Sequence, residues 1–442
     1  MTTRATKIQA GASCRAASRL ALAGLLLSLA GLPAGAVPQI ESTYGGQSPW
    51  YTAELNALSV SGVAQYRGGM STILNPAGLA GAAVPRLDLG LNASHHEEDR
   101  FQPLYDSFES LVDDVAIASN QNTWWGYGFA GALPLIAAPL PVSVGVSLAD
   151  RYPFAYRFEE ELRDPDVFSD PRDRILEERL YEVTGTLRQL SLGVGAGLFD
   201  WLDAGVSLHY AFGERTERKT VRDNALGDGD QSYDDQDDWD LSGTNLSIGL
   251  QAQPHQRVRL GLAYETRLTV DGDHASSAFA AGDSAATVLT GEESLRYPAY
   301  WRFGGAFYPR SDPRTVFSVD VIYADWSELE DSRWGADGDR PFLQEVWDVR
   351  LGLQHTFYNG TDLRFGFRRY DSYADPEGGN SVFGAGVGFP VLAGQLSVSL
   401  ELNKLQSRLG HIFGYPEDFV AEATARVDDL HVRLGLGWKR EF

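Results

Sequence analysis

Residues Leu430–Trp438 read Leu-His-Val-Arg-Leu-Gly-Leu-Gly-Trp, so that every second side chain is large and apolar. The positions between them hold His431, Arg433 and two glycines. Successive side chains of a β-strand point to opposite faces, so the stretch predicts a strand with one apolar face and one polar or small face. Glycines on the polar face would let another part of the backbone approach closely from that side.

The same period of two recurs along most of the chain. It is clearest in residues 87–94, 142–149, 202–211, 347–354 and 396–403. Two stretches without charge, 122–149 and 380–400, contain prolines, which remove a hydrogen bond and therefore disfavour a membrane-spanning helix. We therefore predict an all-β fold, a transmembrane antiparallel β-barrel of about 14 strands.

The connections between these strands alternate between long and short. Long ones include 96–122, 158–184 and 219–238, and short ones include 199–201 and 358–361. Long loops at one end and short turns at the other are typical of barrels in the outer membrane of Gram-negative bacteria. A soluble β-sandwich, the alternative, gives no reason for this asymmetry.

Composition narrows the classes of function. The chain has 442 residues, of which 60 are acidic and 37 basic, and its formal charge is −23. Non-specific binding to nucleic acid needs a basic surface, so we predict no nucleic-acid partner. The single cysteine, Cys14, rules out a disulfide framework and any cysteine-based metal site. We predict neither a metal site nor a cofactor.

The N-terminus divides into two segments. Residues 1–36 hold basic but no acidic residues, then the apolar run Leu20–Leu32, and they end in Ala-Gly-Ala, which predicts a signal peptide. The apolar run is too short for a helix that spans a bilayer, although an N-terminal anchor is the alternative. Residues 37–85 carry only three charges and are expected to fill the barrel lumen as a hatch. The barrel itself is expected over residues 86–442.

The hatch contains the sequence Asn75-Pro76-Ala77, followed by Gly78-Leu79-Ala80-Gly81. Asparagine is a good helix N-cap, proline suits the first helical position, and glycine can end a helix. We predict a short capped helical turn inside the lumen, and a simple surface turn is the alternative.

Together with this motif, several strand sequences resemble the FadL/TodX family of outer-membrane transporters for long-chain fatty acids and hydrophobic compounds. The matching stretches follow in the family's order and are Leu295–Gly304, Asp320–Ser327, Val346–Phe357 and Leu363–Phe367. The resemblance implies a fourteen-stranded barrel with an N-terminal hatch in the outer membrane. It also implies passive uptake of hydrophobic compounds, most often long-chain fatty acids, without cofactor or covalent step.

Other functions remain open on the sequence. A FadL-like barrel that does not transport could act as a scaffold or attachment component of a secretion or surface complex. An open hydrophilic porin is disfavoured by the hatch. We predict that the protein is not an enzyme, because only His209 and His431 are expected to face inward and neither lies in a recognisable catalytic motif.

Four arginines on inward-facing strand positions are candidates for substrate binding, namely Arg302, Arg350, Arg364 and Arg368. Arginine binds a carboxylate through two hydrogen bonds, so one of them could hold a fatty-acid head group. Arg433 is a fifth inward candidate. The alternative is an internal ladder of ion pairs with Asp320, Asp348 and Glu401, because buried charges need partners.

Pro153 lies just after the alternating part of the third strand, in Asp150–Arg157. Proline cannot donate to the strand ladder and could open a bulge. The family resemblance implies a lateral wall opening at this strand, and a strand end near the outer rim is the alternative.

Residues 219–240 form an expected loop that is rich in aspartate. Its oxygen ligands could bind calcium, but the calcium-loop motif is missing, and a solvated loop bridged by divalent ions to lipopolysaccharide is the alternative. As partners we expect outer-membrane lipid, lipopolysaccharide and a hydrophobic small molecule, and we expect a monomer.

Overall fold

The computed structural model describes residues 39–47, 51–105, 108, 110–136, 140–163, 175–224, 231–283, 285–310, 313–334, 340–376, 378–391, 394–413 and 424–442. The predicted signal peptide, residues 1–36, lies outside the described residues.

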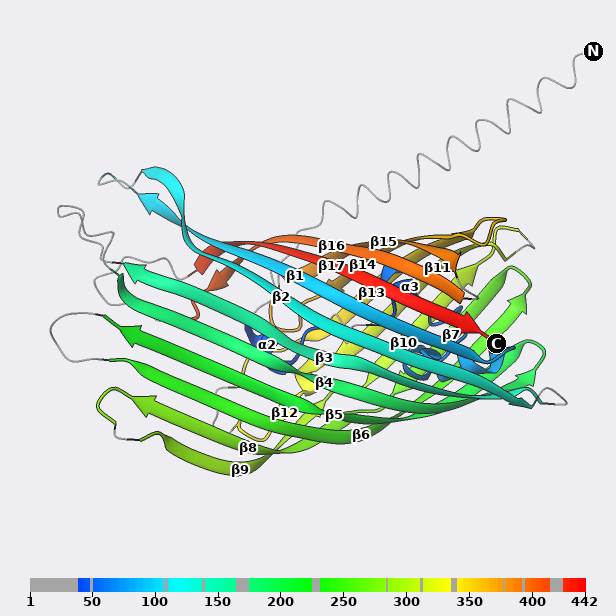
Figure 1. Ribbon diagram of the computed structural model, residues 1–442, viewed down its shortest axis with the longest axis horizontal. Coiled ribbons are helices and arrows are strands. Elements are labelled where there is room, and N and C mark those ends of the chain that lie inside the picture. The colour runs from blue at the N-terminus through cyan, green and yellow to red at the C-terminus, as the bar shows by residue number, and fades with distance from the viewer. Residues whose placement is uncertain are drawn as a thin grey trace, which may run out of the picture.

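The strands form one closed antiparallel sheet (Figure 1). It closes because β1 (Arg86–Tyr105) pairs with both β2 (Leu111–Ile136) and the last strand, β17 (Thr424–Glu441). The remaining strands are β3 (Val142–Arg163), β4 (Ile175–Phe199), β5 (Leu202–Asp223), β6 (Tyr233–His255), β7 (Val258–Glu265), β8 (Leu268–Ala280), β9 (Thr287–Tyr297), β10 (Tyr300–Phe307), β11 (Thr315–Asp325), β12 (Glu330–Asp331), β13 (Glu345–Thr356), β14 (Asp362–Asp371), β15 (Gly379–Val391) and β16 (Gly394–Gly410).

Three crossings of the barrel are each made of two parts. β7 continues as β8, β9 continues as β10, and β11 continues as β12 after the 3₁₀ helix η2 (Trp326–Glu328). The break between β9 and β10 falls at Pro298, which cannot donate to the ladder. The barrel therefore has 14 crossings, and the predicted fold class is confirmed.

The predicted loops 96–122, 158–184 and 219–238 are wrong, because β1–β6 continue far into them. Here the outward face is charged and the inward face mixes charged with apolar side chains, so the ladder persists after the regular alternation has ended. Arg218 and Asp234, for example, form an ion pair of 2.7 Å between β5 and β6. The aspartates 234, 235, 237, 238 and 240 thus lie on a strand, and residues 225–230 lie outside the described residues.

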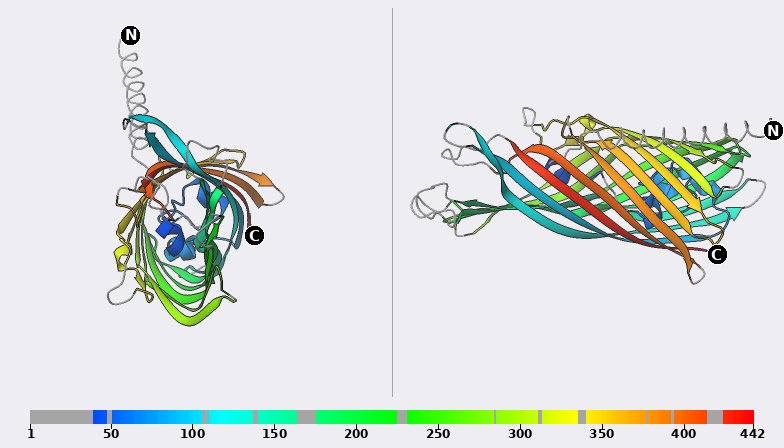
Figure 2. Two further views of the ribbon diagram at one scale, coloured as in Figure 1. Left: turned by 90° about the vertical axis from the view of Figure 1, so that its left-hand side faces the viewer. Right: turned by 90° about the horizontal axis from the view of Figure 1, so that it is seen from above.

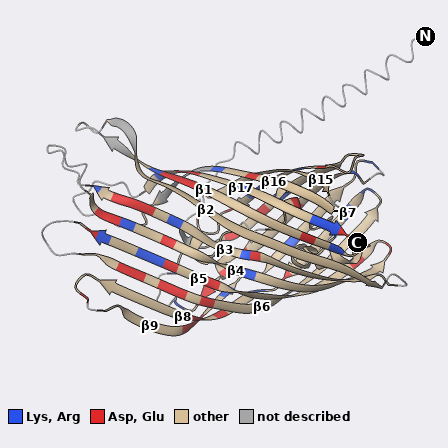
Figure 3. Cartoon of the chain, in the orientation of Figure 1, with Lys and Arg blue, Asp and Glu red and all other residues tan. Residues whose placement is uncertain are grey.

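The outer face of the barrel carries large apolar side chains, as the alternation predicts. Leu91, Leu208 and Ile248 are each about half exposed, at 48%, 52% and 57%. Charged residues gather instead toward the left-hand ends of β3–β6 in Figure 3. Such a belt is typical of a barrel that sits in a bilayer. Among the described residues, the helices are all too short or too polar to span a membrane.

The described N-terminal residues lie inside the ring of strands (Figure 2, left). They form three short α-helices and a 3₁₀ helix, namely α2 (Gln39–Tyr44), α3 (Ala53–Ala57), α4 (Ser71–Leu74) and η1 (Pro76–Gly81). Leu55, Met70 and Leu79 are fully buried there. η1 contacts β3–β6, and α3 contacts β14–β17, so the segment reaches opposite sides of the lumen.

Inward-facing glycines make room for this segment, as the sequence predicted. A Cβ atom built on Gly205 would lie 2.3 Å from the carbonyl carbon of Pro76, and one on Gly249 would lie 2.0 Å from Oδ1 of Asn75. Asn75 caps η1 by accepting a hydrogen bond of 3.1 Å from the amide of Ala77. Its Nδ2 atom donates to the carbonyl of Leu250 at 3.0 Å, which ties the motif to β6.

Candidate functional site

The four predicted arginines all lie inside the barrel, and all are buried. Arg302 forms an ion pair of 2.5 Å with Glu265, which Arg151 contacts from the other side at 2.7 Å. Glu265 is the end of β7, where the strand breaks. This cluster therefore neutralises a buried carboxylate with two guanidinium groups.

Arg350 and Arg368 share Asp348, at 2.7 and 2.9 Å. Both also donate to carbonyls of the N-terminal segment, Arg350 to Val60 at 3.2 Å and Arg368 to Gln47 at 2.8 Å. They therefore hold the N-terminal segment against β13 and β14.

Arg364 contacts Asp362 at 2.5 Å and Glu54 of the N-terminal segment at 3.4 Å. Glu54 is also bound by Arg86 at 2.9 Å and by Lys439 at 3.2 Å. Burial alone would raise the pKa of Glu54, but the attraction of Lys439, Arg364 and Arg86 outweighs it and holds this pKa well below its usual range. Glu54 is thus a charged anchor between α3 and three strands.

The three acidic residues of the predicted ion-pair ladder, Asp320, Asp348 and Glu401, differ in their partners. Asp348 is paired with arginines as described, and Glu401 is paired with Arg433 at 3.1 Å. Asp320 instead accepts hydrogen bonds from the amides of Gly62 and Val63, at 2.6 and 3.0 Å. The ladder alternative is thus met in part, because Arg350, Arg368 and Arg433 pair with Asp348 and Glu401, whereas Arg302 and Arg364 pair with other carboxylates. A role for any of these arginines in substrate binding stays a prediction.

A cavity of about 110 Å³ lies between the N-terminal segment and the wall. Its lining includes Arg368, Arg433, His431, Trp124, Pro153 and Glu41. Charged side chains and the apolar groups of Trp124, Pro153 and Val382 both line it, and it is smaller than the apolar cavity of about 150 Å³ that can hold benzene. Two of the inward arginines and the predicted wall proline thus meet at one cavity.

The third strand changes its inward face close to this cavity. The pairing with β4 shifts by one residue between Asp150 and Tyr152, which marks a β-bulge at Arg151. Before the bulge Ser147 and Ala149 face inward, and after it Tyr152 and Phe154 do so. A shift of one residue exchanges the two faces of a strand, and here it directs a row of aromatic rings into the lumen.

These rings belong to a large aromatic cluster in the lumen. Trp326 stacks on Tyr373 with ring centroids 3.9 Å apart, and Tyr152 stacks on Tyr297 at 4.4 Å. Tyr44 of α2 is buried in the same cluster. Tyr44 therefore packs into a cluster in which aromatic rings and aliphatic side chains are mixed.

Pro153 lies within β3 and is not a strand end, so the alternative of a strand end near the rim is wrong. The sequence suggested a strand end here because the bulge at Arg151 interrupts the alternation, although the strand continues to Arg163. The ladder between β2 and β3 nevertheless ends at the pair Gly128–Ala149, although β3 remains paired with β4 up to Arg163. The described residues thus contain a stretch where neighbouring strands of the wall are not joined by a ladder.

Side chains bridge this unpaired stretch. Asn120 accepts a hydrogen bond of 2.8 Å from the amide of Glu159, and Asn122 donates one of 2.9 Å to the carbonyl of Arg157. Such side-chain bridges can separate without breaking any backbone pairing. The amide of Gly46 donates to the carbonyl of Pro153 at 3.1 Å, so the N-terminal segment contacts this part of the wall.

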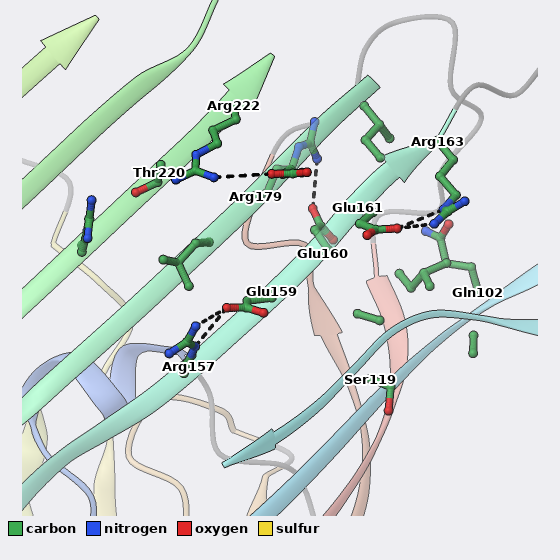
Figure 4. Close-up of a pocket in the computed structure, with 17 residues that line it drawn as sticks. Gln102, Ser119, Arg157, Glu159, Glu160, Glu161, Arg163, Arg179, Thr220 and Arg222 are labelled. Carbon is green, nitrogen blue, oxygen red and sulfur yellow. Dashed lines mark hydrogen bonds and ion pairs between the residues drawn. The ribbon is translucent and has the colours of Figure 1, made fainter. Parts of the chain in front are cut away.

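A larger cavity of about 860 Å³ lies over the outer parts of β2–β5 (Figure 4). Its lining is charged, and the charges are paired within it. Arg179 contacts Glu160 at 3.0 Å, and Arg157 and Arg163 are paired with Glu159 and Glu161. The lining is therefore unsuited to bury an apolar ligand.

The histidines were predicted only in part. His209 is buried, and its ring nitrogens lie 2.7 Å from the hydroxyl of Ser191 and 2.6 Å from that of Ser247. His431 faces inward as expected, whereas His96, which was not predicted, also does so. Asn92, Ser94 and His96 are alternate residues of the same strand, so the period of two, extended by one step, predicts that His96 faces inward.

Comparisons with known proteins bear on the fold. No protein-family model and no curated protein sequence matches the chain. Solved structures do: a Pseudomonas aeruginosa FadL homologue is similar over 89% of this chain and 98% of its own, with a TM-score of 0.64 and 11% identity. The Pseudomonas putida toluene transporter TodX is similar over 89% and 98% of the two chains, with a TM-score of 0.61 and 14% identity. The Ralstonia pickettii toluene transporter TbuX is similar over 90% and 99%, with a TM-score of 0.59 and 14% identity. The chain therefore has the FadL/TodX fold, and the predicted resemblance is confirmed at that level.

Proposed function

We propose that this protein is a passive outer-membrane channel that takes up hydrophobic small compounds and releases them through the wall between β2 and β3. The observation that carries the proposal is the end of the β2–β3 ladder at Gly128–Ala149, beside a lumen cavity that Pro153 lines. Two of the similar solved structures, TodX and TbuX, are toluene transporters, which supports a hydrophobic substrate.

The route follows from the chemistry of the lining. The aromatic cluster around Tyr152 and Trp326 is packed and buried, so a compound that enters from the long-hairpin end has to displace some of its side chains. The free energy of an apolar compound falls by about 25 cal/mol for each Å² of its surface that is removed from water. Contact with these apolar side chains therefore favours entry without an energy source. A lateral exit would then pass the compound into the apolar phase of the bilayer and spare it a return to water.

The size of the cavity bears on the substrate class. A space of about 110 Å³ is smaller than the apolar cavity of about 150 Å³ that holds benzene, so one aromatic ring requires a small displacement of the N-terminal segment and a sixteen-carbon chain a much larger one. The arginines that we predicted for a fatty-acid carboxylate already contact protein carboxylates. We therefore favour small aromatic hydrocarbons, and long-chain fatty acids remain the second candidate.

Uptake by cells of a Gram-negative host without its own channels of this type tests the proposal. We expect expression of the protein to raise the initial rate of radiolabelled toluene uptake several-fold. The initial rate of palmitate uptake should rise by a smaller factor. Arg368→Ala should not lower toluene uptake, because no substrate carboxylate is involved and the loss of its contact with Gln47 can only loosen the N-terminal segment. Faster uptake of palmitate than of its methyl ester, lost in Arg368→Ala, would favour the fatty-acid reading. No increase for any hydrophobic compound would favour the scaffold alternative.

A further inference from the structure

Two histidines and an aspartate converge on the seam where the barrel closes. His96 of β1 lies directly opposite His431 of β17 in the register of the two strands. Asp429 is two residues before His431 on the same strand, so its side chain points to the same face. One ring nitrogen of each histidine and a carboxylate oxygen of Asp429 lie within 4.8 Å of one another.

The three side chains contact one another at ion-pair distances, but without the alignment of hydrogen bonds. Oδ1 of Asp429 lies 2.6 Å from Nε2 of His96 and 3.4 Å from Nε2 of His431. None of the three atoms has an aligned hydrogen-bond partner among the described residues, although all are buried. The three atoms are thus paired only with one another and in poor alignment, and a common partner between them would improve the geometry of all three.

We propose that His96, Asp429 and His431 form a binding site for a divalent transition-metal ion, of the zinc type, that clips the first strand of the barrel to the last. Zinc bonds of about 2.0–2.1 Å in a tetrahedral arrangement place ligand atoms about 3.4 Å apart. The Asp429–His431 spacing already has this value. The Asp429–His96 spacing reaches it when the His96 ring moves by about 1 Å.

The donor set decides the class of ion. Two imidazoles and one carboxylate suit zinc, iron, nickel or copper, whereas calcium and magnesium prefer oxygen ligands alone. Glu98 is not a fourth ligand, because its Oε1 atom accepts from Arg100 at 2.6 Å and from Tyr156 at 3.2 Å. The fourth position is therefore left to water or to a lumen ligand, and His431 lines the cavity of about 110 Å³.

Metal titration of untagged protein, stripped with a chelator and refolded in detergent, tests the site. We expect one Zn²⁺ per barrel by calorimetry, and a visible absorption band when Co²⁺ replaces zinc. Asp429→Asn and His96→Ala should each lower the affinity by at least about 100-fold, because even partners outside the ligand set change metal affinity 10–100-fold. Zn²⁺ should raise the unfolding temperature of the wild type and not of these variants.

His95→Ala is the matched control. His95 is the neighbour of His96 on the opposite face of β1, where its ring contacts Thr123. This variant should bind zinc like the wild type. If His96→Ala fails to show the heat-modifiable mobility of a folded barrel, Asp429→Asn, which keeps the side-chain shape, decides the question. No saturable one-to-one binding in the wild type, or wild-type affinity in folded Asp429→Asn, would overturn the proposal.

Discussion

Gly46 of the N-terminal segment and Pro153 of the wall are joined by a backbone hydrogen bond of 3.1 Å, from the amide of Gly46 to the carbonyl of Pro153. The bond lies where the β2–β3 ladder has ended, so the segment that fills the lumen also contacts the unpaired part of the wall. Movement of the segment and separation of the two strands are therefore expected to be coupled.

Gly45 makes this contact possible, and its substitution should loosen it. Its φ of +105° is one that other residues rarely adopt, and a Cβ there would lie 2.5 Å from Cβ of Tyr152. We expect Gly45→Ala to displace the segment from β3 and to raise the initial rate of toluene uptake. Gly282→Ala is the control, because Gly282 has a φ of +92° but no atom within 4 Å of such a Cβ. Equal uptake in the two variants would argue against the coupling.

Glu54 should matter for the closure of the lumen. Its carboxylate contacts Arg86 and Lys439, and removal of one partner of a buried ion pair typically costs about 3–5 kcal/mol. We expect Glu54→Gln to release α3 from β1 and β17 and to increase single-channel conductance in planar bilayers. Glu330→Gln is the control. It removes an exposed ion pair with Arg296 and should leave the single-channel conductance unchanged. An unchanged conductance in Glu54→Gln would show that α3 is held by packing alone.

Docking of α2 should depend on pH. Burial raises the pKa of Glu41 from 4.5 to about 7, against the hydrogen bond from Ser372 that lowers it. Because the docked segment then holds a proton that the released segment has lost, docking weakens as pH rises from about 4.5 to 7, by on the order of 3 kcal/mol in total. Hydrogen exchange of the α2 amides, corrected for its intrinsic pH dependence, should be more protected at pH 5 than at pH 8. Glu41→Gln should remove this difference, and persistence of the difference in that variant would show that Glu41 is not its cause.

Deletion of residues 37–81 tests the predicted hatch as a whole. The described part of this segment fills the lumen, and Leu55 and Met70 are fully buried within it. We expect a folded barrel with a larger ion conductance, since the glycine-lined inner face would then be open. A folded deletion variant with unchanged conductance would contradict the assignment of this segment as a plug.

The barrel and its cap motif could be predicted from the sequence because both rest on local patterns. The alternation around Leu434 marks a strand with a lipid-facing side, and Asn75 with Pro76 is a recognisable helix start. Strand ends could not be predicted, because hairpins such as that of Arg218 and Asp234 have a charged outward face and a mixed inward face. The bulge at Arg151 also hid the continuation of β3, since one extra residue exchanges the faces of the strand.

The partners of the inward arginines depend on contacts that are distant in sequence. Arg364 meets Glu54 across 310 residues, and Arg350 donates to the carbonyl of Val60 across 290. Periodicity predicts that these side chains face inward, but it cannot say which carboxylates the N-terminal segment brings to them.

If hydrophobic compounds leave through the wall between β2 and β3, a covalent bridge across these two strands should stop their uptake. Cysteines in place of Asn120 and Glu159, which are hydrogen-bonded across the unpaired stretch, can be bridged by a short cleavable thiol cross-linker. The control pair is Glu161→Cys with Glu178→Cys, because these residues are register partners in the intact β3–β4 ladder.

The most direct measurement is the initial rate of toluene uptake before bridging, after bridging and after cleavage of the bridge. We expect the bridge across β2 and β3 to abolish most of the uptake, cleavage of the bridge to restore it, and the β3–β4 bridge to have no effect. Undiminished uptake with β2 and β3 bridged would contradict the lateral route.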